Sequence, residues 1–147
     1  MRVKSWLEDI IGGGGYYTAS LLEAQLSSQE FLASYSHPKL ASALSEKRLI
    51  RLSGRPEIWA YMGRRRDYVI VPRIFCSCRD FLVNSVGRSK HRPCYHLVAQ
   101  VLASRQEAYR ELAGVIDDYE AWRIVSEILE DGLSRTMRAV LRRLGQL

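Results

Sequence analysis

Residues 75–100, FCSCRDFLVNSVGRSKHRPCYHLVAQ, decide the fold of this chain, because they hold all three of its cysteines. Cys76, Cys78 and Cys94 are followed by His96 in the pattern C-x-C-x15-C-x-H. Three thiolates and one imidazole complete the four-coordinate ligand set that a structural zinc ion prefers. The alternative is three buried, inert cysteines beside an unrelated histidine, but such cysteines have no reason to gather in one short window. We therefore predict a Zn2+ site on these four residues.

The spacing within each ligand pair predicts the local structure that holds it. In an extended strand, residues two apart point to the same face, so Cys76 and Cys78 reach one ion if a strand delivers them. Cys94 and His96 would splay by about 200° within a helix, so Cys94 must lie just outside the helix that begins near His96. Pro93 supports this start, because proline fixes its own backbone and pushes its predecessor out of the helical region. The metal should therefore join a strand end to a helix start.

The ligand pattern resembles the SWIM zinc-finger motif, C-x-C-xn-C-x-H, with every ligand position filled. The SWIM-domain subunits of Shu-type recombination complexes add an alanine three residues after the histidine, where this chain has Ala99. Short members of that subgroup are also about this long, and the similarity covers about residues 56–104. The resemblance implies an accessory role in homologous recombination and DNA repair. It also implies a RecA-family recombinase paralogue as protein partner, with DNA as a further partner.

The composition is that of a soluble, basic, globular protein. Of the 147 residues 47% are hydrophobic and 26% charged, which suits one domain with a buried core. No long apolar run is present, so we expect neither a membrane span nor an export signal. Because every cysteine is committed to the metal, we expect a reducing intracellular compartment, the cytoplasm or a eukaryotic nucleus. The net charge of +6 favours nucleic acid or an acidic protein as partner, rather than a small-molecule substrate.

Residues 1–11, MRVKSWLEDII, carry apolar side chains at helical spacing and predict a short amphipathic helix. Four glycines follow, Gly12 to Gly15, and we expect them to tether this helix to one zinc-stabilised domain over residues 16–147. Such a short helix either folds back onto its own core or places its apolar side in the groove of a partner. The residues expected to bind a partner are Trp6, Leu7 and Ile10.

The rest of the chain predicts an α+β fold, a small antiparallel meander of about three strands flanked by helices. Helical periodicity marks residues 17–35, 38–46, 96–114, 117–131 and 133–144. Alternating apolar residues mark strands at 48–52, 57–62 and 67–75. In the second of these, Ile58, Ala60 and Met62 are expected on one face, and Trp59 and Tyr61 on the other. Pro72 should place the last strand at an edge or a bulge. The helix that Asp117 or Asp118 caps is expected to bury the stripe Tyr119, Trp122, Val125, Ile128 and Leu129.

Two clusters of basic residues are candidates for contact with nucleic acid. One is the predicted hairpin tip Arg64, Arg65 and Arg66, and the other is the loop between the ligand pairs, with Arg88, Lys90 and Arg92. The same cations could instead be solvated, or could balance the negative charge that three thiolates leave on zinc. The loop also contains His91, the one rival to His96 as fourth ligand. The arginines of the last helix should be largely solvated; they are Arg135, Arg138, Arg142 and Arg143.

A closed ligand set leaves no open metal position to activate water, so we expect a non-catalytic binding module rather than an enzyme. Asp80, the one carboxylate close behind the first ligand pair, is interpreted as a helix cap. The aromatic residues that could stack on bases, if they are exposed, are Trp59, Tyr61 and Tyr68. Two alternatives stay open: a stand-alone DNA-binding zinc finger in transcription or transposition, and a zinc-stabilised adaptor for acidic proteins.

Overall fold

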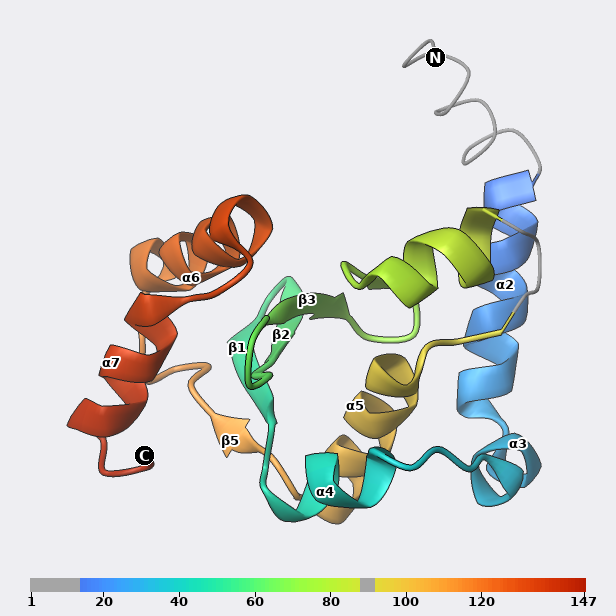
Figure 1. The fold of residues 1–147 in the computed structure, drawn as a ribbon, viewed down its shortest axis with the longest axis horizontal. Helices are drawn as coiled ribbons and strands as arrows, with labels where there is room; N and C mark the ends of the chain where they lie inside the picture. The colour runs from blue at the N-terminus through green and yellow to red at the C-terminus, as the bar shows by residue number, and fades with distance from the viewer. Residues whose placement is uncertain (1–13, 88–91) are drawn as a thin grey trace, which may run out of the picture.

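The computed structural model describes residues 14–87 and 92–147, which form an α+β fold with a mixed sheet between two groups of helices (Figure 1). The strands are β1 (Leu49–Gly54), β2 (Glu57–Tyr61), β3 (Tyr68–Val71), β4 (Phe75–Cys76) and β5 (Arg110–Glu111). The helices are α2 (Gly14–Ser27), α3 (Gln29–Ser34), α4 (Leu40–Ser45), η1 (Phe81–Gly87, π-helical), α5 (Tyr95–Gln106), α6 (Asp118–Asp131) and α7 (Arg135–Arg143). The predicted fold class is confirmed, with five strands in place of about three. The predicted partner-binding residues Trp6, Leu7 and Ile10 lie outside the described residues.

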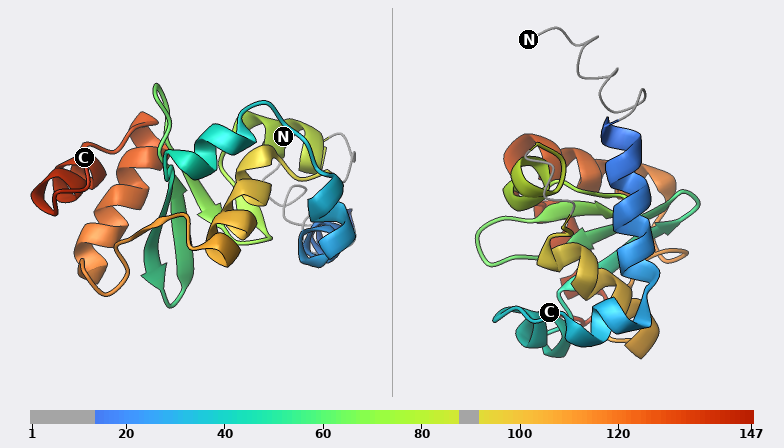
Figure 2. Two further views of the ribbon diagram at one scale, coloured as in Figure 1. Left: turned by 90° about the horizontal axis from the view of Figure 1, so that it is seen from below. Right: turned by 90° about the vertical axis from the view of Figure 1, so that its right-hand side faces the viewer.

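The sheet carries a hydrophobic core on each face, with α5 and the N-terminal helices on one side and α6 and α7 on the other (Figure 2). Strand alternation divides the side chains between the two cores. In β2, Trp59 and Tyr61 face α5, whereas Ala60 faces α6, as the sequence predicts. The α5-side core includes Leu22, Leu26, Leu49, Trp59, Ile70 and Leu97. The α6-side core includes Ile50, Leu52, Val69, Ile124, Met137 and Leu141.

The strand predicted over residues 67–75 is divided into two strands, β3 and β4. The sheet order is β4-β3-β2-β1-β5, and β3 pairs antiparallel with β4. The chain turns between them at 72–74, where Arg73 has a φ of 65° and the Ile74 amide donates to the Val71 carbonyl at 3.0 Å. Proline has no N–H for the ladder, so Pro72 ends β3 instead of bulging it.

The helix predicted from His96 to Gly114 is too long, because α5 ends at Gln106. Glu107 closes it in the left-handed conformation, with a φ of 54°. The chain then forms β5, which pairs parallel with β1 through the partners Ile50 and Arg110. The apolar pattern extends past residue 106 because Leu112 is also buried. Leu112 belongs to the α6-side core, however, and not to the core that α5 faces.

The helix predicted over 17–35 is also divided. Ser28 ends α2 and caps α3, since its hydroxyl oxygen accepts from the Phe31 amide at 3.3 Å. Serine competes for backbone hydrogen bonds and therefore favours a cap over a helix interior. At its other end α2 begins at Gly14, so the last two glycines of the predicted tether are helical.

Asp117, one of the two predicted capping residues, caps α6, and of the predicted buried stripe only Val125 and Ile128 are buried. The Asp117 carboxylate accepts from the Glu120 amide at 2.8 Å, and Gly132 ends the helix. The helix buries Ile124, Val125 and Ile128. Three predicted stripe residues are instead exposed, Tyr119 by 72%, Trp122 by 63% and Leu129 by 58%. Two apolar stripes compete on this helix, and only contact with the sheet decides which one is buried.

Arg138 of α7 is not solvated as predicted, because it is ion-paired with the buried Asp67. Its guanidinium contacts the two carboxylate oxygens of Asp67 at 2.6 and 2.9 Å. Asp67 also accepts from the Ser134 amide at 2.8 Å, and Arg138 donates to the Gly63 carbonyl at 3.1 Å. This bidentate pair ties the β2–β3 connection to the start of α7.

Candidate metal centre

The four predicted ligands come together at one buried point beside the sheet. Cys76 ends β4, Cys78 lies two residues further on, Cys94 precedes α5, and His96 lies in its first turn. All four side chains are buried, and their ligand atoms lie within 4.8 Å of one another. The rival ligand His91 lies outside the described residues.

The first ligand pair keeps a common direction although β4 stops at Cys76. Ser77 continues the pairing with β3, because its amide donates to the Val69 carbonyl at 3.0 Å and its hydroxyl accepts from the Val69 amide at 2.9 Å. The backbone therefore stays extended long enough for Cys76 and Cys78 to point to the same side. The prediction that an extended segment brings Cys76 and Cys78 to the same point is confirmed, although only Cys76 belongs to β4.

The second ligand pair lies on either side of the start of a helix, as the sequence predicts. Cys94 is the N-cap of α5 and is extended, with a φ of −69° and a ψ of 160°. His96 is the second residue of the helix. The helix start brings the two ligands to one point, whereas a regular helix would separate them. Ala99, one turn further on, is fully buried in the α5-side core.

The donor set and its geometry fit a tetrahedral zinc ion. Zinc–sulfur and zinc–nitrogen bonds of about 2.3 and 2.0–2.1 Å place tetrahedral S and N ligands about 3.6 Å apart. Cys76 Sγ and His96 Nδ1 are 3.8 Å apart. Cys78 Sγ also accepts from the Phe81 amide at 3.3 Å, a contact that stabilises a thiolate. The other ring nitrogen of His96, Nε2, is buried and has no hydrogen-bond partner among the described residues.

The three thiols influence each other's ionisation because they are buried together. Burial raises the pKa of Cys76 well above its ordinary value, and the neighbouring thiols raise it further. Hydrogen bonds from Cys76 and Cys94 lower the pKa of Cys78. The buried cluster therefore favours one thiolate over three unless a cation neutralises the others. A divalent metal supplies that charge and would release protons on binding.

Three tyrosines surround the imidazole of His96. The ring centroid of Tyr95 lies 4.0 Å from that of His96, and those of Tyr61 and Tyr68 lie 4.5 and 4.7 Å away. Tyr61 and Tyr68 are directly paired across β2 and β3, which explains why both reach the same histidine. On its other side Tyr95 stacks on His37 at 4.3 Å. The sequence reading missed this setting, because the tyrosines come from three separate segments.

Asp80 is not the helix cap that the sequence suggested. Its carboxylate accepts from the side-chain amide of Asn84 at 2.7 Å. The Phe81 amide is bound by the sulfur of Cys78 instead, and the Leu82 amide by the Cys78 carbonyl. Cys78 thus caps this helix start as well as contributing to the cluster.

The two predicted basic clusters are only partly described. Arg64, Arg65 and Arg66 are exposed in the connection between β2 and β3. Gly63 is required there, because a Cβ at this position would lie 2.0 Å from the Arg66 carbonyl oxygen. Arg92 is exposed just before the second ligand pair, and Arg88 and Lys90 lie outside the described residues. Of the aromatic residues predicted for stacking, Trp59 and Tyr61 belong to the core and Tyr68 is half-buried.

These features define a class of site, a buried centre of three cysteines and one histidine that could hold a metal ion such as zinc. No family model, curated protein or solved structure matches this chain. Among the described residues, no helix combines the length and the apolar character needed to cross a bilayer. The site is therefore characterised by its own residues.

Proposed function

We propose that this chain is a non-catalytic binding module whose fold is stabilised by zinc, and that it acts as an accessory subunit in homologous recombination and DNA repair. The observation that carries the proposal is the convergence of Cys76, Cys78, Cys94 and His96 within 4.8 Å. Zinc on these four ligands would be four-coordinate and would supply folding free energy rather than an activated water. The process is taken from the resemblance of the ligand pattern and Ala99 to SWIM subunits of Shu-type complexes.

The position of the centre suits a structural role. It lies at the end of β4, the start of η1 and the start of α5, so a metal there would cross-link all three elements. Cys76, Cys78 and Cys94 belong to the same hydrophobic cluster as Trp59 and Leu97. A metal at this point would hold α5 against the sheet, and with it the α5-side core.

The exposed face of α6 supports a protein partner, which we propose to be a RecA-family recombinase paralogue. Tyr119, Trp122 and Leu129 repeat at spacings of three and seven residues, so they lie on one side of the helix, and all three are exposed. Exposed aromatic side chains that gather on one side of a helix are typical of interaction surfaces, because aromatic residues are enriched there relative to the rest of a protein surface. We call these three residues the α6 stripe.

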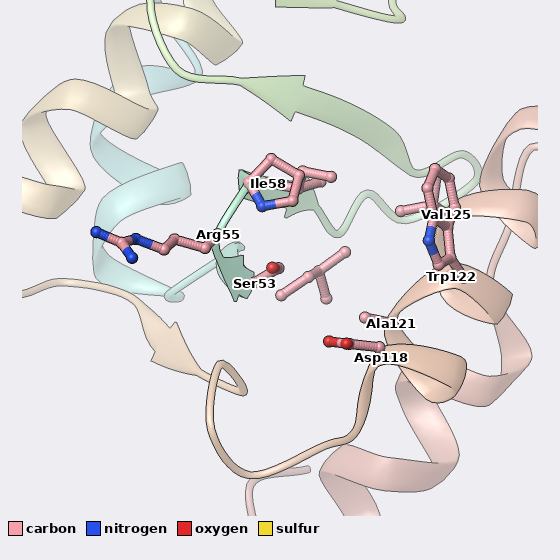
Figure 3. Close-up of a pocket in the computed structure, with 9 residues that line it drawn as sticks. Ser53, Arg55, Ile58, Asp118, Ala121, Trp122 and Val125 are labelled. Carbon is pink, nitrogen blue, oxygen red and sulfur yellow. The ribbon is translucent and has the colours of Figure 1, made fainter.

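A hollow of about 130 Å3 beside the α6 stripe offers a place for an anchoring side chain. It lies between α6 and the β1–β2 hairpin, and Trp122 forms part of its wall (Figure 3). Ile58 and Val125 provide apolar lining, and Asp118 lies at the helix start. Small apolar hollows beside an aromatic residue are typical of sites that take one hydrophobic side chain of a partner.

The partner proposal is tested by co-purification from the native host, with the bound proteins identified by mass spectrometry. We expect the wild-type chain to recover a RecA-family paralogue, and Trp122→Ser with Leu129→Ser to lose it while the melting temperature stays unchanged. Ile74→Ser is the matched control, since Ile74 is 53% exposed in the β3–β4 turn. Recovery of that paralogue by the stripe variant would contradict docking through α6, and failure of the wild type to recover it would contradict the assigned partner.

A second candidate, a stand-alone DNA-binding zinc finger in transcription or transposition, is favoured by the exposed arginines Arg64, Arg65 and Arg66. The two functions differ in what the isolated chain does. A stand-alone finger should select a preferred DNA sequence through base contacts. An accessory subunit should show no sequence preference and should need its protein partner for tight binding. Selection from a random oligonucleotide pool separates them.

A further inference from the structure

A hollow on the metal side of the molecule is strongly basic. It has a volume of about 470 Å3 and lies between α4 and the β2–β3 connection. We call it the basic groove, and its cationic residues are Lys39, Arg48, Arg64, Arg65 and Arg66. Glu46 is its one carboxylate among the described residues, so five cations and one anion give the lining a formal charge of +4.

Most of these cations are free to bind an external anion. Arg48 is committed, since it pairs with Glu46 at 2.6 Å and donates to the Met62 carbonyl at 2.8 Å. Arg64 lies 3.8 Å from the same carboxylate with its side chain 80% exposed, which is a weak contact. Lys39 and Arg65 are exposed, and they have no ion-pair partner in the part of the chain that the structure describes. The groove therefore has uncompensated positive charge at its rim.

The floor of the groove consists of the three tyrosines around His96. Tyr61, Tyr68 and Tyr95 line it. A phenol hydroxyl can donate a hydrogen bond to a phosphate oxygen, and the hydroxyls of Tyr95 and Tyr61 lie together at 3.5 Å. The ring of Tyr95 lies between His37 and His96, which leaves little of either face for a stacked base. The floor therefore suits phosphate oxygens better than bases.

A second hollow adjoins the basic groove at Tyr95, and in it one cation, Arg92, is accompanied by one carboxylate, Asp80. It has a volume of about 320 Å3 and is lined by His37, Arg92 and Asp80 among others. Tyr95 lines both hollows, so the stacked pair of Tyr95 and His37 separates two halves of one path. The path runs from the arginines of the β2–β3 connection to Arg92 beside the metal centre. A path with cations at both ends suits a polymer with repeated negative charge rather than a single anion.

We propose that the basic groove and its continuation bind the phosphodiester backbone of a nucleic acid, without regard to base sequence. The proposal adds a ligand to the proposed function. It rests on that function in one respect, because the proposed metal ligand His96 contacts the three tyrosines of the floor. Arg64, Arg65 and Lys39 contact phosphates at one end, and Arg92 contacts them at the other. The tyrosine hydroxyls between them bind phosphate oxygens.

The test uses the full chain and two labelled probes, an oligo-dT strand and a DNA duplex of equal length, followed by fluorescence anisotropy over a range of salt concentrations. We expect binding that weakens with salt, with a slope of log K against log salt of about 0.7 per contacted phosphate for the strand and about 0.9 for the duplex. Arg64→Gln with Arg65→Gln should weaken binding severalfold and reduce the slope by about 1.4 for the strand. Whichever probe binds more tightly identifies the form of the nucleic acid.

Arg142→Gln is the control, since Arg142 is exposed on α7, a helix that packs on the face of the sheet opposite α5 (Figure 2). An equal loss in the control and in the groove variant would overturn the proposal, because it would show a diffuse charge effect. The proposal would also be overturned if polyglutamate competed with the labelled probe as effectively as unlabelled oligo-dT does at the same charge concentration. Absence of binding at low salt would also overturn it.

Zinc content measured on the same samples separates this inference from the proposed function. If the wild type holds zinc and binds neither probe, the groove is rejected and the zinc module stands. If the wild-type chain binds each probe equally well with and without metal, the groove does not depend on the metal through His96. The same result contradicts the proposal that the fold depends on zinc. Loss of binding on chelation, with recovery after zinc is restored, supports both.

Discussion

The two faces of the sheet are stabilised in different ways. On the α5 side, the hydrophobic core includes Cys76, Cys78 and Cys94, which form with His96 a buried cluster that could hold a metal ion. On the α6 side, the core is apolar, and its main polar element is the paired Asp67 and Arg138. If the cluster holds zinc as proposed, the first face depends on a bound ion, whereas the second is stabilised by residues of the chain alone. Four predictions test this difference.

Loss of one metal ligand should have the largest effect. Structural zinc contributes about 10–16 kcal/mol of binding free energy, which equals or exceeds the typical net stability of a domain, about 5–15 kcal/mol. Cys78→Ser, or chelation of the wild type, should therefore unfold the α5 side. Amide hydrogen exchange should lose protection in α5 and β4 before it does in α6 and α7. Re-addition of zinc should restore the wild type but not the variant, and uniform protection without metal would show that the two faces do not differ.

Breaking the ion pair of the other face should have a smaller effect. Arg138→Ala leaves the buried carboxylate of Asp67 without its bidentate partner, which costs about 3–5 kcal/mol. Zinc content should stay unchanged, since the pair and the cluster lie on separate cores. Urea unfolding measures the loss. If Asp67→Asn with Arg138→Leu costs as much as Arg138→Ala, the loss is not due to an uncompensated charge.

Two substitutions on α6 should separate the core from the proposed docking surface. Ile124→Ala creates a cavity in the α6-side core and should cost about 2–5 kcal/mol. Trp122→Ala removes a larger but exposed side chain and should change stability by less than about 0.5 kcal/mol. Thermal unfolding of both variants provides the comparison. A large loss for Trp122→Ala would mean that this residue stabilises the fold and is not free to dock.

The smallest effect concerns pH and Glu127, which caps the start of α7. Burial alone would raise the pKa of Glu127, but hydrogen bonds from Thr136 and Ser134 outweigh it and lower the pKa. A lowered pKa in the folded state contributes stability at neutral pH, which is lost as the pH falls from the unfolded value near 4.3 through the folded value. Glu127→Gln should therefore cost about 1 kcal/mol at pH 7 and progressively less below pH of about 4. A cost that does not change with pH would contradict this account.

The sequence predicted the metal cluster well because its chemistry is local. Cys94 is the N-cap of α5 because Pro93 and the two-residue spacing require it, and no distant contact is needed. The alternation in β2 assigned Trp59 and Ala60 to opposite cores for the same reason. Local geometry could be predicted from the sequence wherever residue type and short spacing determine it.

The errors concern choices that only distant contacts decide. The spacing of three residues between Tyr119 and Trp122 fits one side of a helix as well as the spacing of four between Ile124 and Ile128, so the sheet alone selects the buried side of α6. The parallel pairing of β5 with β1 joins residues 60 positions apart, and no local pattern indicates it. Nor could the tyrosines around His96 be found, because Tyr61, Tyr68 and Tyr95 meet only after the sheet and α5 have assembled.

The central claim is that one metal ion holds the α5 side of this molecule to its sheet. Elemental analysis of the full chain, purified without added metal or chelator, tests it most directly. The account predicts zinc at one ion per chain, lost in Cys78→Ser and retained in Arg138→Ala. A folded, protected α5 side with no stoichiometric metal would contradict it.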